Sequence, residues 1–237
     1  MNQLEALKEK LRVIRMLRVL KRSYTYEELS KITGLPITVL NRYVRGKVLP
    51  STERAKILAQ QLAPYLNLAE EVRKRLQFDS FGFFDTMKVL SDTNLVALIA
   101  EDVALRYMGK GVTKVLTAAT DGIPLAVQIA DELGVDIVYA KKKKEVGVEK
   151  FYEVNYVPSA SGSVTTLYLP QWALKKGDRV LIVDDVIRSG ETQRALLQMC
   201  KQANAIPVGM FFLISVSDVV DRLREEYNVP VESLVRL

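Results

Sequence analysis

The stretch VLIVDDVIRSGET, residues Val180 to Thr192, decides the fold of this chain of 237 residues. Its first four residues are apolar and predict a buried strand, which two acids, Asp184 and Asp185, follow directly. After a short turn of small and polar residues, a helical pattern begins at Thr192. A buried strand that leads straight into a helix is the unit from which parallel sheets with helices on both faces are built.

The same alternation runs through the second part of the chain. The predicted helices are residues 92–107, 123–133 and 192–203, and the predicted strands are residues 112–116, 135–140, 180–183 and 206–214. This order predicts an α/β domain with a doubly wound parallel sheet, in which ligands bind at the carboxyl ends of the strands. Asp184 and Asp185 follow one of those ends, whereas residues 215–237 carry no diagnostic motif.

The turn after the acids suits a phosphate monoester. Backbone N–H groups and the helix dipole at the start of a helix attract an anion. Ser189 and Thr192 add hydroxyl donors, and Gly190 permits a close backbone approach. Carboxylates cannot bind that phosphate, but they accept hydrogen bonds from a vicinal diol, and a ribose 5-phosphate carries both groups. An N-cap aspartate after a buried strand would explain only one of the two acids.

This string of residues resembles the phosphoribosyl-pyrophosphate (PRPP) motif of type I phosphoribosyltransferases. The resemblance implies that Asp184 and Asp185 bind the ribose hydroxyls. It also implies a loop that binds the 5′-phosphate, made of Ile187, Arg188, Ser189, Gly190, Glu191 and Thr192.

Two further stretches agree with that family. TAATDGIPLA, residues 117–126, resembles its pyrophosphate loop, and the lysines 141–144 stand where the family has basic residues. The implied pyrophosphate ligands are Ala119, Thr120, Asp121, Gly122, Lys141 and Lys142. A solvated surface run is the alternative for Lys143 and Lys144. Residues 145–163 are predicted to cover the ligand, next to a hairpin of residues 152–157 and 163–169.

The N-terminal block is strongly basic. Residues 1–77 hold 16 Lys and Arg against 7 Glu and no Asp, whereas the rest of the chain is slightly acidic. This division predicts a module that binds a polyanion, with a helical domain of residues 1–77 before a ligand domain of residues 78–237. A solvated helical surface, or a helical domain for assembly, is the alternative.

Residues 2–21 have the periodicity of an amphipathic helix. Thr25 and Glu28 form the pattern of a capping box for a helix that ends near Gly34, and Pro36 introduces another helix over residues 37–44. Two short helices joined by a tight turn form a helix-turn-helix unit. Its predicted core is Leu29, Ile32, Leu35, Val39 and Leu40.

Residues 26–51 resemble the helix-turn-helix of phage-repressor and Cro-type regulators. The resemblance implies that the second helix enters the major groove of duplex DNA. Thr38, Asn41 and Arg42 would then face base edges, while Arg45 and Lys47 would contact phosphates. Residues 51–77 continue as helices, with Asn67 and Glu70 in the pattern of another capping box.

The composition excludes several classes of site. The chain has no histidine, so the usual zinc sites and Ser-His catalysis are excluded, and its single cysteine, Cys200, allows no intrachain disulfide. No apolar run approaches the ~20 residues of a membrane span, and the N-terminus lacks the pattern of a signal peptide. We therefore expect a cytoplasmic protein without a metal site, a tightly bound cofactor or a membrane partner, with Mg²⁺ accompanying PRPP at most.

The ligand domain also resembles the regulators of this family. ATDGIPLA and VNYVPSASGS are similar to stretches of the bacterial purine repressors, whose N-terminus is a winged helix. With its Cro-like unit, the chain resembles more closely the archaeal GfcR-type regulators, which are orotate phosphoribosyltransferase-like. The expected function is a transcription regulator that senses PRPP or a related nucleotide and controls nucleotide or sugar metabolism. The expected assembly is a homodimer on a palindromic operator in duplex DNA.

Four residues depart from the enzymes of the family. Ala119 stands where adenine and xanthine enzymes have Glu, and Asp121 stands where orotate enzymes often have Lys. Glu191 is unusual beside a phosphate, and Ser163 replaces a basic residue of the covering hairpin. The chain therefore lacks several residues that the enzymes have in their active site, so we expect weak or absent turnover and name no catalytic residue. The alternative is an active purine or orotate phosphoribosyltransferase with an N-terminal assembly domain.

Overall fold

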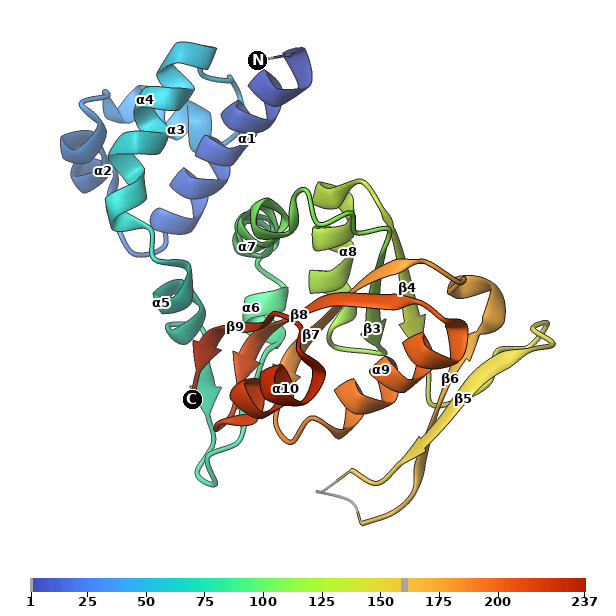
Figure 1. Cartoon of the computed structure of the whole chain (residues 1–237). Coiled ribbons are helices and arrows are strands. Elements are labelled where there is room, and N and C mark those ends of the chain that lie inside the picture. Colours follow the sequence, from blue (N-terminus) through green and yellow to red (C-terminus); the bar gives the residue numbers. More distant parts are fainter. Residues whose placement is uncertain (1, 159–161) are drawn as a thin grey trace. The chain divides into compact units, whose positions relative to one another are not determined.

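The computed structural model describes residues 2–158 and 162–237, and Figure 1 shows their course. The chain divides into two compact units, residues 1–99 and 100–237. Residues 78–99, which the composition assigns to the second domain, group in space with the first unit. None of the helices in the described residues is both long and apolar enough to cross a membrane.

The first unit is mainly helical. Its helices are α1 (Gln3–Leu20), α2 (Tyr26–Thr33), α3 (Ile37–Val44), α4 (Thr52–Leu62), η1 (Ala63–Tyr65), α5 (Leu68–Arg73), α6 (Met87–Leu90) and the start of α7 (Thr93–Tyr107). A small antiparallel hairpin of β1 (Gln77–Phe78) and β2 (Phe84–Asp85), which the sequence did not predict, precedes α6.

The helix-turn-helix forms as predicted because its start and stop signals are local. The Thr25 hydroxyl accepts from the N–H of Glu28 at 3.2 Å, and the Glu28 carboxylate accepts from the N–H of Thr25 at 2.7 Å. Gly34 ends α2 with a φ of 68°, a left-handed conformation that glycine adopts without steric cost. Helix α3 then has the predicted bounds.

The predicted core of this unit is partly confirmed. Leu29 and Leu40 are fully buried, whereas Ile32, Leu35 and Val39 are half-buried. The sequence missed Tyr43 of α3, which is buried, and the contribution of α1. The C-terminal half of α1 packs on its neighbours nearly all round, with Val13, Ile14, Met16, Leu17, Val19 and Leu20 buried.

An ionic cluster joins Asp92, just before α7, to the helical part of the chain before it. The carboxylate of Asp92, which is buried, accepts from Arg75 at 3.0 Å and pairs with Arg22 at 3.3 Å. Arg75 also pairs with the buried Glu71 of α5 at 2.7 Å. Removing one partner of such a network leaves a buried charge without compensation. Asp92 therefore joins the start of α7 to the residues that directly follow α1 and α5.

The second unit is built on a five-stranded sheet in the order β4-β3-β7-β8-β9, with all neighbours parallel. The strands are β3 (Lys114–Ala118), β4 (Asp136–Ala140), β7 (Arg179–Ile187), β8 (Ile206–Ser215) and β9 (Val231–Arg236). A separate antiparallel hairpin, β5 (Phe151–Tyr156) and β6 (Thr165–Pro170), follows β4 and leads through η2 (Gln171–Ala173) toward β7.

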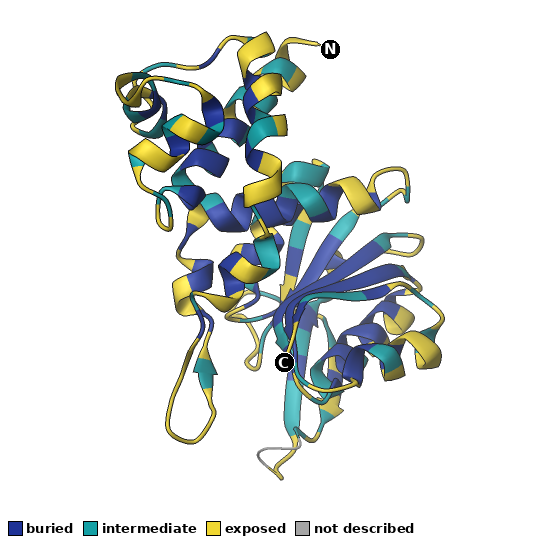
Figure 2. Cartoon of the chain, turned by 90° about the vertical axis from the view of Figure 1, so that its left-hand side faces the viewer, coloured by how far each residue is buried: buried dark blue, intermediate teal, exposed yellow. Residues whose placement is uncertain are grey.

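The sheet is doubly wound, which confirms the predicted fold class. Helix α8 (Ile123–Leu133) connects β3 to β4, whereas α9 (Glu191–Ala203) and α10 (Val219–Tyr227) connect β7, β8 and β9 in the opposite direction. Right-handed crossovers in opposite directions place α8 on one face and α9 and α10 on the other, as Figure 1 shows. Figure 2 shows the buried residues concentrated in the strands and on the helix faces that cover them.

Candidate functional site

The two carboxylates of the opening stretch lie within a strand rather than after one. Strand β7 continues through Asp184 and Asp185 to Ile187, because β8 pairs with it as far as Ile187. The prediction of a strand that ends at Val183 was therefore wrong. Strand β3, the neighbour on the other side, pairs with β7 only as far as Ile182. The acids thus lie where β3 has stopped pairing, at its carboxyl end, as the expected site requires.

Asp184 is held in place by α9. It is 8% exposed, the side-chain amide of Gln193 donates to its Oδ2 at 3.0 Å, and the N–H of Asp185 donates to its Oδ1 at 3.1 Å. Burial, and then the nearby charge of Asp185, hold the pKa of Asp184 well above its usual value. Gln193 itself is buried and was not predicted. Ionising two buried, adjacent carboxyl groups costs free energy unless hydrogen-bond donors or cations stabilise the charges.

The pyrophosphate loop meets this acid pair at Gly122. A Cβ on Gly122 would lie 2.5 Å from the hydroxyl oxygen of Thr117 and 3.2 Å from the Cα of Asp184. Real Cβ atoms essentially never approach other atoms within 3.0 Å, so the position accepts no side chain as the structure stands. The fold therefore brings together two of the stretches that the sequence singled out.

The rest of that loop spans the space between β3 and α8. The N–H of Ala119 donates to the carbonyl of Ala140 at the end of β4, at 2.8 Å, and the Ala119–Thr120 peptide bond is cis. Thr120 and Asp121 are exposed. Gly122 precedes the first residue of α8, so the loop ends at a helix N-terminus, which attracts anions.

The predicted phosphate turn is shorter than expected. Ile187 belongs to β7, and α9 already begins at Glu191, so Arg188, Ser189 and Gly190 alone form the connection. Gly190 has a φ of 89°, in the left-handed region that favours glycine. The Ser189 hydroxyl donates to the Glu191 carboxylate.

Three residues that the sequence did not reveal support this turn. The guanidinium of Arg194 donates to the carbonyl of Ser189 at 3.2 Å and pairs with Glu226 of α10 at 2.7 Å. The Thr192 hydroxyl lies 3.4 Å from that of Tyr156, at the end of β5. These contacts join residues from separate elements of the second unit, so no local sequence pattern could have indicated them.

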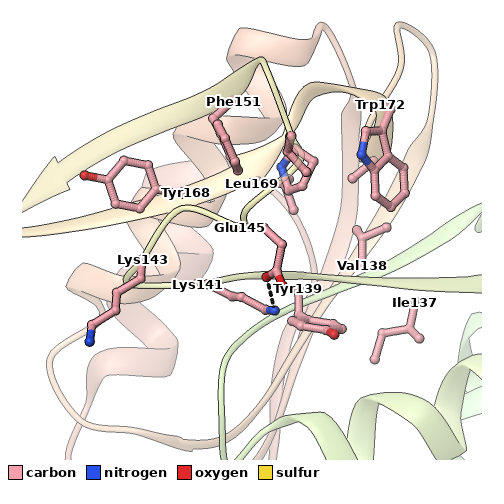
Figure 3. Close-up of a pocket in the computed structure, with 13 residues that line it drawn as sticks. Ile137, Val138, Tyr139, Lys141, Lys143, Glu145, Phe151, Tyr168, Leu169 and Trp172 are labelled. Atoms are coloured by element: carbon pink, nitrogen blue, oxygen red, sulfur yellow. Dashed lines mark hydrogen bonds and ion pairs between the residues drawn. The ribbon is translucent and has the colours of Figure 1, made fainter.

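The lysines after β4 are partly engaged. Lys141 pairs with Glu145, as the dashed line in Figure 3 shows. Lys144 pairs with Glu153 at 2.6 Å and lies 5.3 Å from the ring centroid of Tyr168, so it is more than a solvated lysine. Lys142 and Lys143 are exposed. Of the predicted covering loop, residues 159–161 lie outside the described residues.

The predicted DNA-reading residues lie on or next to α3. Thr38, Arg42, Arg45 and Lys47 are exposed, and Asn41 is half-buried. Arg18 of α1, which the sequence did not single out, donates from Nε to the carbonyl of Val44 at 2.9 Å and from Nη1 to the side chain of Asn94 at 3.4 Å. Arg18 therefore fixes the C-terminal end of α3.

The buried state of Asp184 predicts a pH dependence of stability. Because its pKa is raised in the folded protein, the stability that it contributes is present below its usual value of 3.8 and is lost as the pH rises through the raised pKa. Asp184→Asn removes the ionisation, so it should raise the free energy of unfolding at neutral pH and flatten its pH dependence. Urea unfolding over a pH series measures both effects.

Asp131→Asn is the matched control, because Asp131 is an exposed residue of α8 and the substitution is the same. We expect it to leave the pH dependence unchanged. If the Asp184→Asn variant is less stable than the wild type at neutral pH, burial of the ionised Asp184 carboxylate does not destabilise the folded protein, and the prediction is wrong.

Comparison with known proteins agrees with this geometry. Residues 89–232 match the model of the phosphoribosyl transferase domain, and residues 14–63 match a helix-turn-helix model. The purine biosynthesis transcriptional repressor PurR of Bacillus subtilis is 29% identical over 146 residues, which cover 62% of this chain and 51% of the repressor. The chain thus spans about half the length of that relative.

Two enzymes are also similar. Xanthine phosphoribosyltransferase of Shouchella clausii is 32% identical over 176 residues, which cover 72% of this chain and 88% of the enzyme. The crystal structure of adenine phosphoribosyltransferase from Rhodothermus marinus superposes with a TM-score of 0.64 at 26% identity, covering 72% of this chain and 98% of the enzyme. The chain therefore belongs to the phosphoribosyl transferase domain family, and it carries a helix-turn-helix domain before that domain.

Proposed function

We propose that the chain is a DNA-binding transcription regulator whose phosphoribosyl transferase domain senses PRPP or a related nucleotide. One observation carries the proposal. A helix-turn-helix unit that exposes Thr38 and Arg42 on its second helix, and Arg45 and Lys47 just after it, stands in one chain with a domain whose buried acid pair lies against a glycine loop. A helix-turn-helix domain implies DNA binding. The similarity to a purine repressor supports the same assignment.

In this proposal the ligand lies across the carboxyl end of β3. Asp184 and Asp185 accept hydrogen bonds from the ribose hydroxyls, and residues 188–192 receive the 5′-phosphate at the start of α9. The pyrophosphate would contact residues 119–122 together with Lys141 and Lys142. Mg²⁺ would arrive with PRPP, since it binds phosphate oxygens together with few protein ligands.

The regulator is proposed to bind its ligand without turning it over. Ala119 stands where adenine and xanthine enzymes of the family have Glu, and Asp121 stands where orotate enzymes often have Lys. The chain also has no histidine for acid–base chemistry. The second candidate is an active phosphoribosyltransferase, which the similarity to a xanthine enzyme over 88% of its length favours. An assay of phosphoribosyl transfer to purine bases and orotate separates the two, because an enzyme should reach ~1 per second or more.

The proposed assembly is a homodimer on duplex DNA. One helix-turn-helix unit reads only a few base pairs, so two units are needed for useful specificity. A two-fold dimer binds a palindromic operator whose half-sites lie about one helical turn, or a multiple, apart. The resemblance to GfcR-type regulators supports control of nucleotide or sugar metabolism, inside the cell.

The ligand site is tested by removing both negative charges. Asp184→Asn with Asp185→Asn should weaken PRPP binding by a few kcal/mol, because charge-assisted hydrogen bonds contribute about 1.5–3 kcal/mol each. Isothermal titration calorimetry in the presence of Mg²⁺ measures the change. Asp131→Asn is again the control and should bind as the wild type does. Equal affinity of the double variant and the control would overturn the assignment of the acid pair.

The DNA surface is tested by two substitutions with different expected signatures. Arg42→Ala should relax sequence preference, since Arg42 is proposed to contact a base edge. Lys47→Ala should weaken binding to all duplexes alike and reduce the slope of log affinity against log salt by about one. Competition footprinting and anisotropy at several salt concentrations measure these quantities. The proposal fails if both variants bind specific and random duplexes as the wild type does.

A further inference from the structure

A cavity of about 230 Å³ lies at the outer edge of the sheet, beside β4. Strand β4, the loop that follows it, the hairpin β5–β6 and η2 supply its walls, and Figure 3 shows the residues that line it. Strand β6 is tied to the end of β4 here by two backbone hydrogen bonds between Lys141 and Tyr168, of 2.9 and 2.8 Å. The cavity is therefore framed by regular structure within the second unit.

Aromatic rings form much of the wall. Tyr139, Phe151, Tyr168 and Trp172 come from four different elements and all line the cavity. Trp172 is 69% exposed and Tyr139 is 38% exposed, although side chains of this kind are usually covered. Exposed rings around a hollow offer faces on which a flat ring can stack. A planar aromatic ligand fits this arrangement.

The polar part of the wall is an ion pair. The ammonium of Lys141 and the carboxylate of Glu145 meet at the cavity, whereas Figure 3 shows the ammonium of Lys143 pointing away from Trp172. Glu145 can accept a hydrogen bond and Lys141 can donate one, so the pair matches a ligand edge that carries both a donor and an acceptor. While Lys141 is paired with Glu145, the pair carries no net charge, which favours a neutral ligand over an anion at this part of the wall.

The size of the cavity limits the ligand further. Sites for drug-sized ligands measure about 300–1,000 Å³, and this one is smaller. One bicyclic ring system suits it, whereas a nucleotide with sugar and phosphate does not. Asp184, Asp185 and the turn before α9 do not line it.

We propose that this cavity binds a neutral bicyclic heteroaromatic base of the purine type, stacked among the rings and hydrogen-bonded to Glu145 and Lys141. The site is separate from the one proposed for ribose and phosphate. Lys141 is also a proposed contact of the pyrophosphate, so a base that hydrogen-bonds to Glu145 would change how strongly Glu145 holds the Lys141 ammonium. That coupling rests on the proposed function, whereas binding of the base does not.

The only tryptophan of the chain lines the cavity, so tryptophan fluorescence reports on this site alone. Hypoxanthine added to the full chain, without PRPP, should change the fluorescence of Trp172 saturably. Caffeine has the same bicyclic ring but no N–H donor, so it should bind at least tenfold more weakly. Omitting PRPP keeps the test independent of the proposed function, whose failure would show in the calorimetry of PRPP instead.

Two matched variants complete the experiment. Glu145→Gln removes the cavity carboxylate and should weaken hypoxanthine binding at least tenfold. Glu153→Gln, on β5, removes a carboxylate that pairs with Lys144 but does not line the cavity, and it should have no effect. Thermal unfolding verifies that both variants are folded. Absence of a saturable change up to millimolar hypoxanthine, equal binding of caffeine, or equal effects of the two variants would each overturn the proposal.

Discussion

The contact between Gly122 and Asp184 is the constraint on which the candidate site depends. Strand β7 carries a carboxylate into the interior, and the loop after β3 passes so close that only a glycine fits beside it. Gln193 then supplies one donor to that carboxylate from α9. Elements that are far apart in the chain thus fix the acid pair at one place. A preorganised acceptor of this kind would bind the proposed ribose diol without first having to order its own side chains.

The cost of this arrangement is electrostatic. Two neighbouring acids, each less than a tenth exposed, raise the pKa of Asp184 and make the empty site unfavourable at neutral pH. A diol that donates hydrogen bonds to the pair relieves part of that cost. Ligand binding is therefore expected to stabilise the second unit, because a ligand that binds only the folded state shifts the unfolding equilibrium.

Local signals in the sequence predicted the helices well. The capping box at Thr25 and the glycine at residue 34 are contained within a few residues, so the bounds of α2 and α3 followed from the sequence. The end of β7 was not predicted, because the strand continues through Asp184 and Asp185 only by pairing with β8. Strand β9 and α10 carried no motif at all. Their place became visible only once the sheet was assembled.

The site shows the same division between local and distant information. Asp184 and the phosphate turn were predicted because their residue types match a chemical need within a short stretch, and Gly122 was predicted because its loop resembles the pyrophosphate loop of the family. Gln193, Arg194 and Tyr156 act through partners on other elements, so the sequence could not indicate them. Asp92 is a similar case: its salt bridges with Arg22 and Arg75 contribute to the grouping of residues 78–99 with the first unit, and no pattern near Asp92 indicated them.

The central claim is that ligand binding changes DNA binding. A ligand can do so only if it binds the DNA-competent and incompetent states differently, and such coupling is typically worth about 5- to 150-fold in affinity. Two routes are open: closure of the pyrophosphate and covering loops, or competition of PRPP with DNA for Lys141 and Lys142. We favour closure, because the basic excess lies in residues 1–77.

The most direct measurement is the affinity of the chain for duplex DNA, followed by fluorescence anisotropy with and without PRPP at fixed salt and Mg²⁺. The duplex is first selected as a genomic fragment that the chain binds. We predict that PRPP changes the affinity at least fivefold. We also predict that a variant with Lys141→Ala and Lys142→Ala binds DNA normally without ligand but no longer responds to PRPP. Weaker DNA binding of that variant without ligand would indicate competition. An affinity that PRPP, nucleoside monophosphates and free bases all leave unchanged would contradict the account.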